Sequence, residues 1–154
     1  MSKYAESTEV PADRSRAEIE RTLERYGATG FMYGWQAQQA VVAFQVHGKM
    51  LRFIVPLPDK REFALTPTGR RRTPSSMESA YEQASRQKWR ALALVIKAKL
   101  EAVESGITTF EEEFLAQIVL PSGDTVAQWM LPQVEQAYLT HSMPQLLPML
   151  GPGS

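Results

Sequence analysis

The chain has 154 residues, of which 44% are hydrophobic and 22% charged, and its 17 Lys and Arg balance its 17 Asp and Glu. A chain of this length is expected to form one domain that buries roughly two thirds of its unfolded surface. The absence of cysteine excludes disulfides and thiolate chemistry, which fits a reducing cytoplasm. No apolar run approaches the ~20 residues of a membrane span, and the N-terminus is too polar for a signal peptide. We therefore expect a cytoplasmic protein without a membrane partner.

The predicted elements begin after an N-terminal arm. Residues 1–12 have no periodicity and are interpreted as a flexible arm. Residues 13–26 are expected to form a helix, with Asp13 as its N-cap and Gly27 after its end. Three apolar residues form its inward face: Ile19, Leu23 and Tyr26. Its charged residues alternate in sign, which is typical of a solvated face.

The clearest β pattern follows this helix. Aromatic residues alternate with smaller or polar ones at Phe31, Tyr33 and Trp35, which predicts a first strand. Residues 40–55 predict a hairpin with His47-Gly48 as its two-residue turn. This turn pairs Val46 with Lys49, Phe44 with Leu51, Val42 with Phe53 and Ala40 with Val55. In this register one face of the hairpin is almost wholly apolar. The other face is mixed.

A connector at residues 59–76 leads to a long helix at residues 77–105, which contains neither Gly nor Pro. Apolar residues recur along it at steps of three and four: Trp89, Leu92, Ile96, Leu100 and Val103. Val95 is expected to widen this face. Ser75 or Ser76 is the expected N-cap, and Gly106 follows the C-terminus.

Two shorter helices are expected in the last third of the chain. Thr109 and Glu112 fit a capping box that opens a helix over residues 110–119. Thr125 and Gln128 repeat the pattern for a helix over residues 126–139, which contains Pro132. The domain prediction is thus an arm at 1–12, a single α+β domain at 13–139 and a Pro-rich tail at 140–154. Within this domain, residues 13–105 form the core and residues 106–139 a helical extension.

The fold class predicted by this order is α+β. It comprises a helix, a three-stranded antiparallel meander, a long central helix and then a small helical C-terminal region.

The net charge is balanced, but the charged residues are distributed unevenly over three blocks of the chain. Residues 1–59 carry seven basic and seven acidic residues, residues 60–99 carry ten basic and three acidic, and residues 100–154 carry seven acidic and no Lys or Arg. One interpretation is a basic surface for a polyanion. The other is that the basic and acidic blocks face each other, within the fold or across a homo-oligomer. The sequence leaves both open.

Motifs for catalysis are not found. The chain has no glycine-rich phosphate loop, dinucleotide fingerprint or nucleophile elbow. Two histidines and no cysteine argue against a transition-metal site, and adjacent helical carboxylates at residues 111–113 diverge too much to share one ion. We predict a non-enzymatic protein without cofactor or metal. A hydrolase built on paired carboxylates stays open, because such a pair needs no local motif.

The basic residues offer a candidate binding surface. At 100° per residue, Arg86, Arg90 and Lys97 form one stripe beside the apolar face of the long helix. A basic loop precedes this helix, and one arginine lies on the mixed face of the hairpin. If all of these converge, the predicted nucleic-acid-binding residues are Arg52, Arg70, Arg71, Arg72, Arg86, Arg90 and Lys97.

The order helix, three antiparallel strands and long helix, over about residues 14–105, resembles two nucleic-acid-binding cores. One is the double-stranded RNA-binding domain. The other is the central unit of single-strand annealing proteins, which the segments Tyr26-Gly27 and Tyr33-Gly34-Trp35 resemble in their aromatic-glycine rhythm. The whole chain also resembles small uncharacterised proteins encoded by bacteriophages and prophages. This resemblance implies a phage-type protein in the host-cell cytoplasm.

Two functions from different classes follow. The first is a nucleic-acid-binding protein, with single-stranded DNA as a candidate ligand and a homo-oligomer as the expected form. The alternative is an interaction or assembly protein, with anti-defence proteins in this class, whose basic and acidic blocks meet across a subunit contact.

Overall fold

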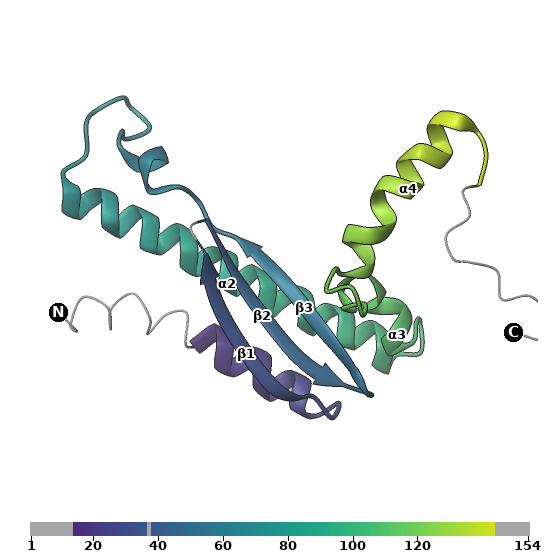
Figure 1. The fold of residues 1–154 in the computed structure, drawn as a ribbon. Coiled ribbons are helices and arrows are strands. Elements are labelled where there is room, and N and C mark those ends of the chain that lie inside the picture. Colours follow the sequence, from purple (N-terminus) through teal and green to yellow (C-terminus); the bar gives the residue numbers. More distant parts are fainter. Residues whose placement is uncertain (1–13, 37, 144–154) are drawn as a thin grey trace, which may run out of the picture.

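The structure is a computed structural model that describes residues 14–36 and 38–143. A helix over residues 14–24 precedes three antiparallel strands, a long helix and a C-terminal helical region, so the fold is α+β as predicted (Figure 1). The predicted arm at 1–12 lies outside the described residues. So does the part of the predicted tail that begins at residue 144.

The sheet is a meander in the order β1-β2-β3, with bounds Thr29–Gln36, Gln39–Val46 and Lys49–Pro56. All four predicted hairpin pairs are present, from Val46 with Lys49 to Ala40 with Val55. His47 and Gly48 have positive φ values of 53° and 75°, as a two-residue turn of this type requires. The register prediction is confirmed, because a slip of one residue would expose the apolar face.

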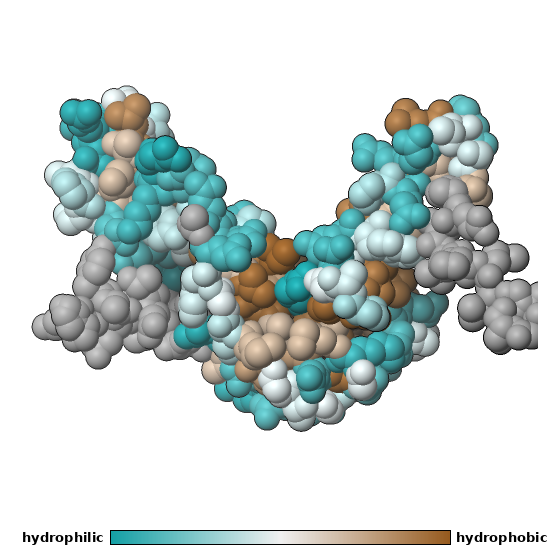
Figure 2. All heavy atoms as spheres, viewed as in Figure 1, coloured by the Kyte–Doolittle hydropathy of each residue, from teal (hydrophilic) through white to brown (hydrophobic). Residues whose placement is uncertain are grey.

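The two faces of the sheet have different surroundings. The N-terminal helix and the long helix cover one face. The other is open to solvent, and Figure 2 shows it as the floor of a hollow between two protruding arms. One arm is the segment of residues 57–73 with the start of the long helix, and the other is the last helix.

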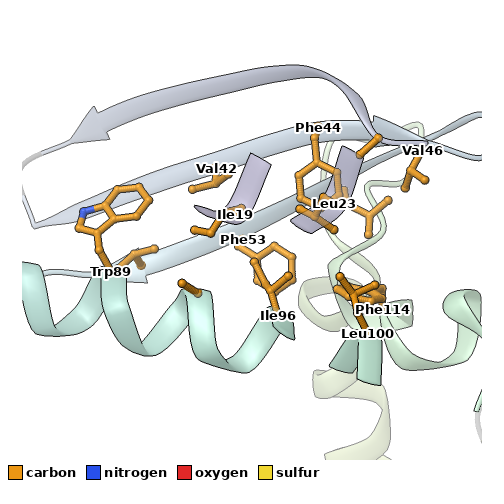
Figure 3. Close-up of a cluster of buried hydrophobic side chains, with 14 of the residues drawn as sticks. Ile19, Leu23, Val42, Phe44, Val46, Phe53, Trp89, Ile96, Leu100 and Phe114 are labelled. Carbon is orange, nitrogen blue, oxygen red and sulfur yellow. The ribbon is translucent and has the colours of Figure 1, made fainter. Parts of the chain in front are cut away.

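The core lies between the covered face and the two helices (Figure 3). Ile19 and Leu23 from the N-terminal helix meet Val42 and Phe44 from β2, and none of the four exposes more than 1% of its surface. Buried residues of the long helix close the core from below: Trp89, Ala93, Ile96 and Leu100. The periodic residues that the sequence singled out thus fix the helix beneath the sheet.

The long helix, α2, spans Pro74–Glu104 and begins earlier than expected. The Thr73 side chain accepts a hydrogen bond from the Ser76 amide, and proline occupies the first helical turn, where its missing N–H costs nothing. The predicted cap at Ser75 or Ser76 is therefore wrong. Val95 is 47% exposed, so it does not widen the buried face.

The connector before α2 is more ordered than its composition indicates. A 3₁₀ turn, η1, spans Lys60–Phe63, and Asp59 caps it. Residues 64–72 then form a small hairpin. The Thr66 amide donates to the Arg70 carbonyl, the Arg72 amide donates to the Ala64 carbonyl, and Gly69 takes a positive φ.

The helix predicted at residues 110–119 is much shorter. Thr109 and Glu112 form the expected capping box of α3, but α3 spans only Phe110–Glu113 and the 3₁₀ turn η2, Leu115–Gln117, follows. The cause is Phe114, whose side chain is fully buried and whose φ and ψ of −103° and 12° leave the helical region. Burial of this ring redirects the chain toward β3, where the Val119 amide donates to the Met50 carbonyl.

The last helix, α4, spans Val126–Thr140, one residue beyond the predicted range. The predicted capping box of Thr125 and Gln128 is present, and Pro132 lies inside the helix. α4 packs against η2 and projects away from the sheet (Figure 1).

Candidate functional site

A groove of about 650 Å³ runs between the N-terminal helix and α2. We call it the arginine groove, because arginines from both helices line it. Its lining residues are Arg14, Ser15, Glu18, Gln83, Arg86, Gln87 and Arg90. All seven are polar or charged, so the groove suits a hydrophilic ligand and not an apolar one.

Packing of the core places these side chains. Arg86 and Arg90 lie one helical turn apart, about 6 Å along α2, and flank the buried Trp89. Arg14 and Glu18 are one turn apart on the N-terminal helix, which Ile19 anchors in the core. The same contacts that hold the two helices under the sheet therefore hold the arginines side by side.

Within the described residues, the positive charge of the groove is only partly compensated. Among residues 14–36 and 38–143, no hydrogen bond or ion pair reaches the guanidinium of Arg14, Arg86 or Arg90. Three guanidinium groups face one lining carboxylate, that of Glu18. Such a surface attracts an anion electrostatically and offers several N–H donors in fixed fork geometry.

An aromatic cluster contacts the N-terminal helix, but none of its residues lines the groove. The Arg16 guanidinium carbon is 4.9 Å from the centroid of the Tyr33 ring and 5.4 Å from that of Trp35. Tyr33 also contacts Trp89, with ring centroids 6.3 Å apart, and its hydroxyl donates to Glu20. Burial and this hydrogen bond raise the pKa of Tyr33 above its usual value. Trp35 is 54% exposed, so part of its ring faces solvent.

Three of the predicted residues share one surface. Arg86 and Arg90 line the groove, and the exposed Lys97 continues their stripe, seven residues or about 10 Å further along α2. Sequence reasoning missed Arg14 and Arg16, because the alternating charges of the N-terminal helix were interpreted as a solvated face. The signal available in the sequence was the position of these two arginines on the helix relative to the buried Ile19.

The other predicted residues lie elsewhere. Arg70, Arg71 and Arg72 precede α2, and about 18 Å of helix separates Pro74 from Arg86. Arg52 lies on the open face of the sheet, opposite α2. Its guanidinium donates to the Gly123 carbonyl at 2.8 Å and to the Gln128 side chain at 3.0 Å. The expected convergence is thus wrong for Arg52, which supports the base of α4.

The acidic block neutralises little of the basic block. Glu113 pairs with Lys99, and Glu111 contacts His47 at 2.9 Å, which lowers the Glu111 pKa. Glu112 completes the capping box of α3. The three adjacent carboxylates therefore have separate local roles, and none of them reaches the arginine groove.

The described part of the chain shows no clear site for catalysis or metal binding. A smaller pocket of about 290 Å³ involves Asp59, Lys60 and Arg61, but Arg61 already pairs with Asp59 at 2.6 Å and lowers the Asp59 pKa to about 2. No group of three or more His, Asp or Glu side chains is placed to hold a metal there. None of the helices over residues 14–143 has the length and apolar character needed to cross a membrane.

Comparison of the chain with protein-family models, with curated proteins and with solved structures finds no match in any of the three.

Proposed function

We propose that the protein binds single-stranded nucleic acid, without catalysing a reaction, and that the arginine groove holds the phosphate backbone. The observation that carries this proposal is the meeting of Arg14, Arg86 and Arg90 in one groove, where none of them pairs with a carboxylate of residues 14–36 or 38–143. Phosphate contacts supply most of the affinity in non-specific nucleic-acid binding, and each contact releases condensed counterions.

The arrangement of the arginines suits a backbone ligand. Two of them are spaced along the axis of α2 and the third faces them from the N-terminal helix, so a strand that follows the groove meets several guanidinium groups in succession. Each guanidinium can donate two parallel hydrogen bonds to one phosphate. Lys97 extends the same track toward the C-terminus of α2.

The aromatic cluster at the N-terminal helix, outside the groove lining, favours a single strand over a duplex. A base that is free of pairing can stack on the exposed part of Trp35, with Arg16 close to the same ring. Stacking of this kind is worth about 1–3 kcal/mol per base and tolerates any sequence. Paired bases in a duplex do not offer this surface. The proposal therefore predicts weak sequence preference.

Fluorescence anisotropy with a labelled oligothymidine of about 20 nucleotides tests the proposal, because this length spans at least one typical site. The test variant carries Arg86→Glu and Arg90→Glu. The matched control carries Lys88→Glu and Lys49→Glu, two exposed lysines outside the groove, so both variants change the net charge equally. Single-stranded RNA and duplex DNA of the same length serve as competitors.

We expect the wild type and the control to bind the oligonucleotide in low salt and the groove variant to lose most of its affinity. Duplex DNA is expected to compete less well than either single strand. No binding by the wild type in dilute buffer would refute the proposal. Equal loss in the control would show that overall charge, and not the groove, carries the interaction.

A further inference from the structure

α4 leaves most of its surface exposed among the described residues. None of its 15 residues is buried, and Glu135 is the one Asp, Glu, Lys or Arg within it. Leu131, Val134 and Tyr138 recur at steps of three and four residues on one face and are 62%, 40% and 79% exposed. A helix of this length is marginal in water unless an apolar face is packed against something. The composition, poor in charge and rich in large apolar and aromatic residues, is that of an interface centre.

The base of α4 is fixed to the sheet. The Val126 amide donates to the Ile118 carbonyl, and the Leu120 amide donates to the Asp124 carbonyl. The Arg52 side chain on β3 donates hydrogen bonds to the Gly123 carbonyl and to the side chain of Gln128, which belongs to the capping box of α4. These bonds orient α4 outward, so the helix cannot fold onto its own sheet without breaking them.

The open face of the sheet is a second exposed apolar surface. Met32 on β1 and Ile54 on β3 are 53% and 38% exposed, and Val41 between them is partly exposed. Figure 2 shows apolar side chains on the floor of the hollow, between α4 and the arm of residues 57–73. Residues 14–36 and 38–143 therefore carry both a protruding apolar helix and an apolar hollow that these residues do not fill.

We propose that α4 docks in the hollow of a second copy of this chain, and that the exchange is reciprocal across a two-fold axis. One association event then covers both surfaces on both copies, which a two-fold interface achieves with the same residues on each side. The three large apolar side chains of α4 offer on the order of 400 Å², and docking them covers a similar area of the partner's hollow, so each copy buries about 800 Å². That area is the standard size for a stable interface.

Charge favours the same partner. Residues 114–143 carry Asp124 and Glu135 and no Lys or Arg, whereas the arm of residues 57–73 on the other side of the hollow carries five basic and two acidic residues. In the reciprocal arrangement α4 of one copy, whose one charged residue is Glu135, enters a hollow that is bordered by the arm of the other, which has a net charge of +3. Complementary potentials of this kind guide association and orientation.

Sedimentation velocity of the full, nuclease-treated chain tests the proposal at about 1 to 100 µM, which brackets a micromolar Kd. The variants are Leu131→Glu in α4 and Ile54→Glu in the hollow. The matched control is Gln136→Glu, which adds the same charge on the opposite side of α4. Circular dichroism checks that each variant folds, and a chain ending at Met143 tests whether residues 144–154 fill the hollow instead.

We expect a dimer for the wild type, for Gln136→Glu and for the shortened chain, and at least a tenfold weaker association for Leu131→Glu and for Ile54→Glu. The dimer should persist in high salt, where nucleic-acid binding is lost, so the two proposals fail independently. A monomeric wild type would overturn the proposal. So would a dimer that either interface variant leaves intact, or a dimer that forms only after residues 144–154 are removed.

Discussion

Arg90→Gln isolates one proposed phosphate contact. For single strands, each contact contributes about −0.7 to the slope of log affinity against log salt concentration, so the three arginines of the groove, counted without Lys97, give a slope of about −2.1. A rise from 50 to 200 mM salt should then weaken wild-type binding about 18-fold. With two contacts left, the slope falls to about −1.4 and the same change in salt weakens binding about 7-fold.

Anisotropy titrations with oligothymidine at four salt concentrations measure both slopes. Lys88→Gln is the control, since Lys88 is exposed on the same helix, two residues away, and does not line the groove. Its slope should equal that of the wild type. A variant slope that matches the wild type, or equal changes for Arg90→Gln and Lys88→Gln, would contradict the assignment of Arg90 to a phosphate.

Two further predictions concern stability. Phe114→Ala removes a fully buried ring that stacks on Phe110 with centroids 4.5 Å apart, so chemical denaturation should show a loss of about 3–5 kcal/mol in the free energy of unfolding. Leu115→Ala, at a half-exposed neighbour, should cost under about 1 kcal/mol, and equal losses would contradict the packing argument. Tyr33 has a raised pKa in the folded state, so its contribution to stability is complete below the unfolded pKa of about 10 and declines as the pH rises above it. Tyr33→Phe should therefore flatten the loss of stability above pH 10, and an unchanged profile would contradict this.

Local signals explain why so much of the fold was predictable. The His47-Gly48 turn and the alternation on either side of it fixed the hairpin register, because only one register buries Phe44, Leu51 and Phe53 together. The capping boxes at Thr109 and Thr125 marked helix starts in the same way. Each of these signals acts within a few residues of chain.

The errors arose where distant packing overrides local preference. Phe114 ends α3 because its ring packs in the core against Phe53 of β3. The sequence of residues 110–119 alone does not indicate this contact. The start of α2 was missed for a different reason. Several hydroxyl residues precede the helix, and proline at the first position makes Thr73 the better cap.

The candidate site was only partly predictable for a similar reason. The helical spacing of Arg86, Arg90 and Lys97 follows from the sequence, but the approach of Arg14 depends on how the N-terminal helix lies against α2. Arg52 was correctly placed on the mixed face of the hairpin. Which face the helices cover determines whether it joins the others, and that is a property of tertiary packing.

Photo-crosslinking tests the central claim most directly. A single-stranded oligonucleotide with 4-thiothymidine is bound to the wild-type protein, irradiated, digested and mapped by mass spectrometry. The arginine groove predicts crosslinks within residues 14–36 and 83–97, with Trp35 among the modified side chains. Crosslinks confined to α4 or to the open face of the sheet, or no crosslinks at saturating oligonucleotide, would contradict the account.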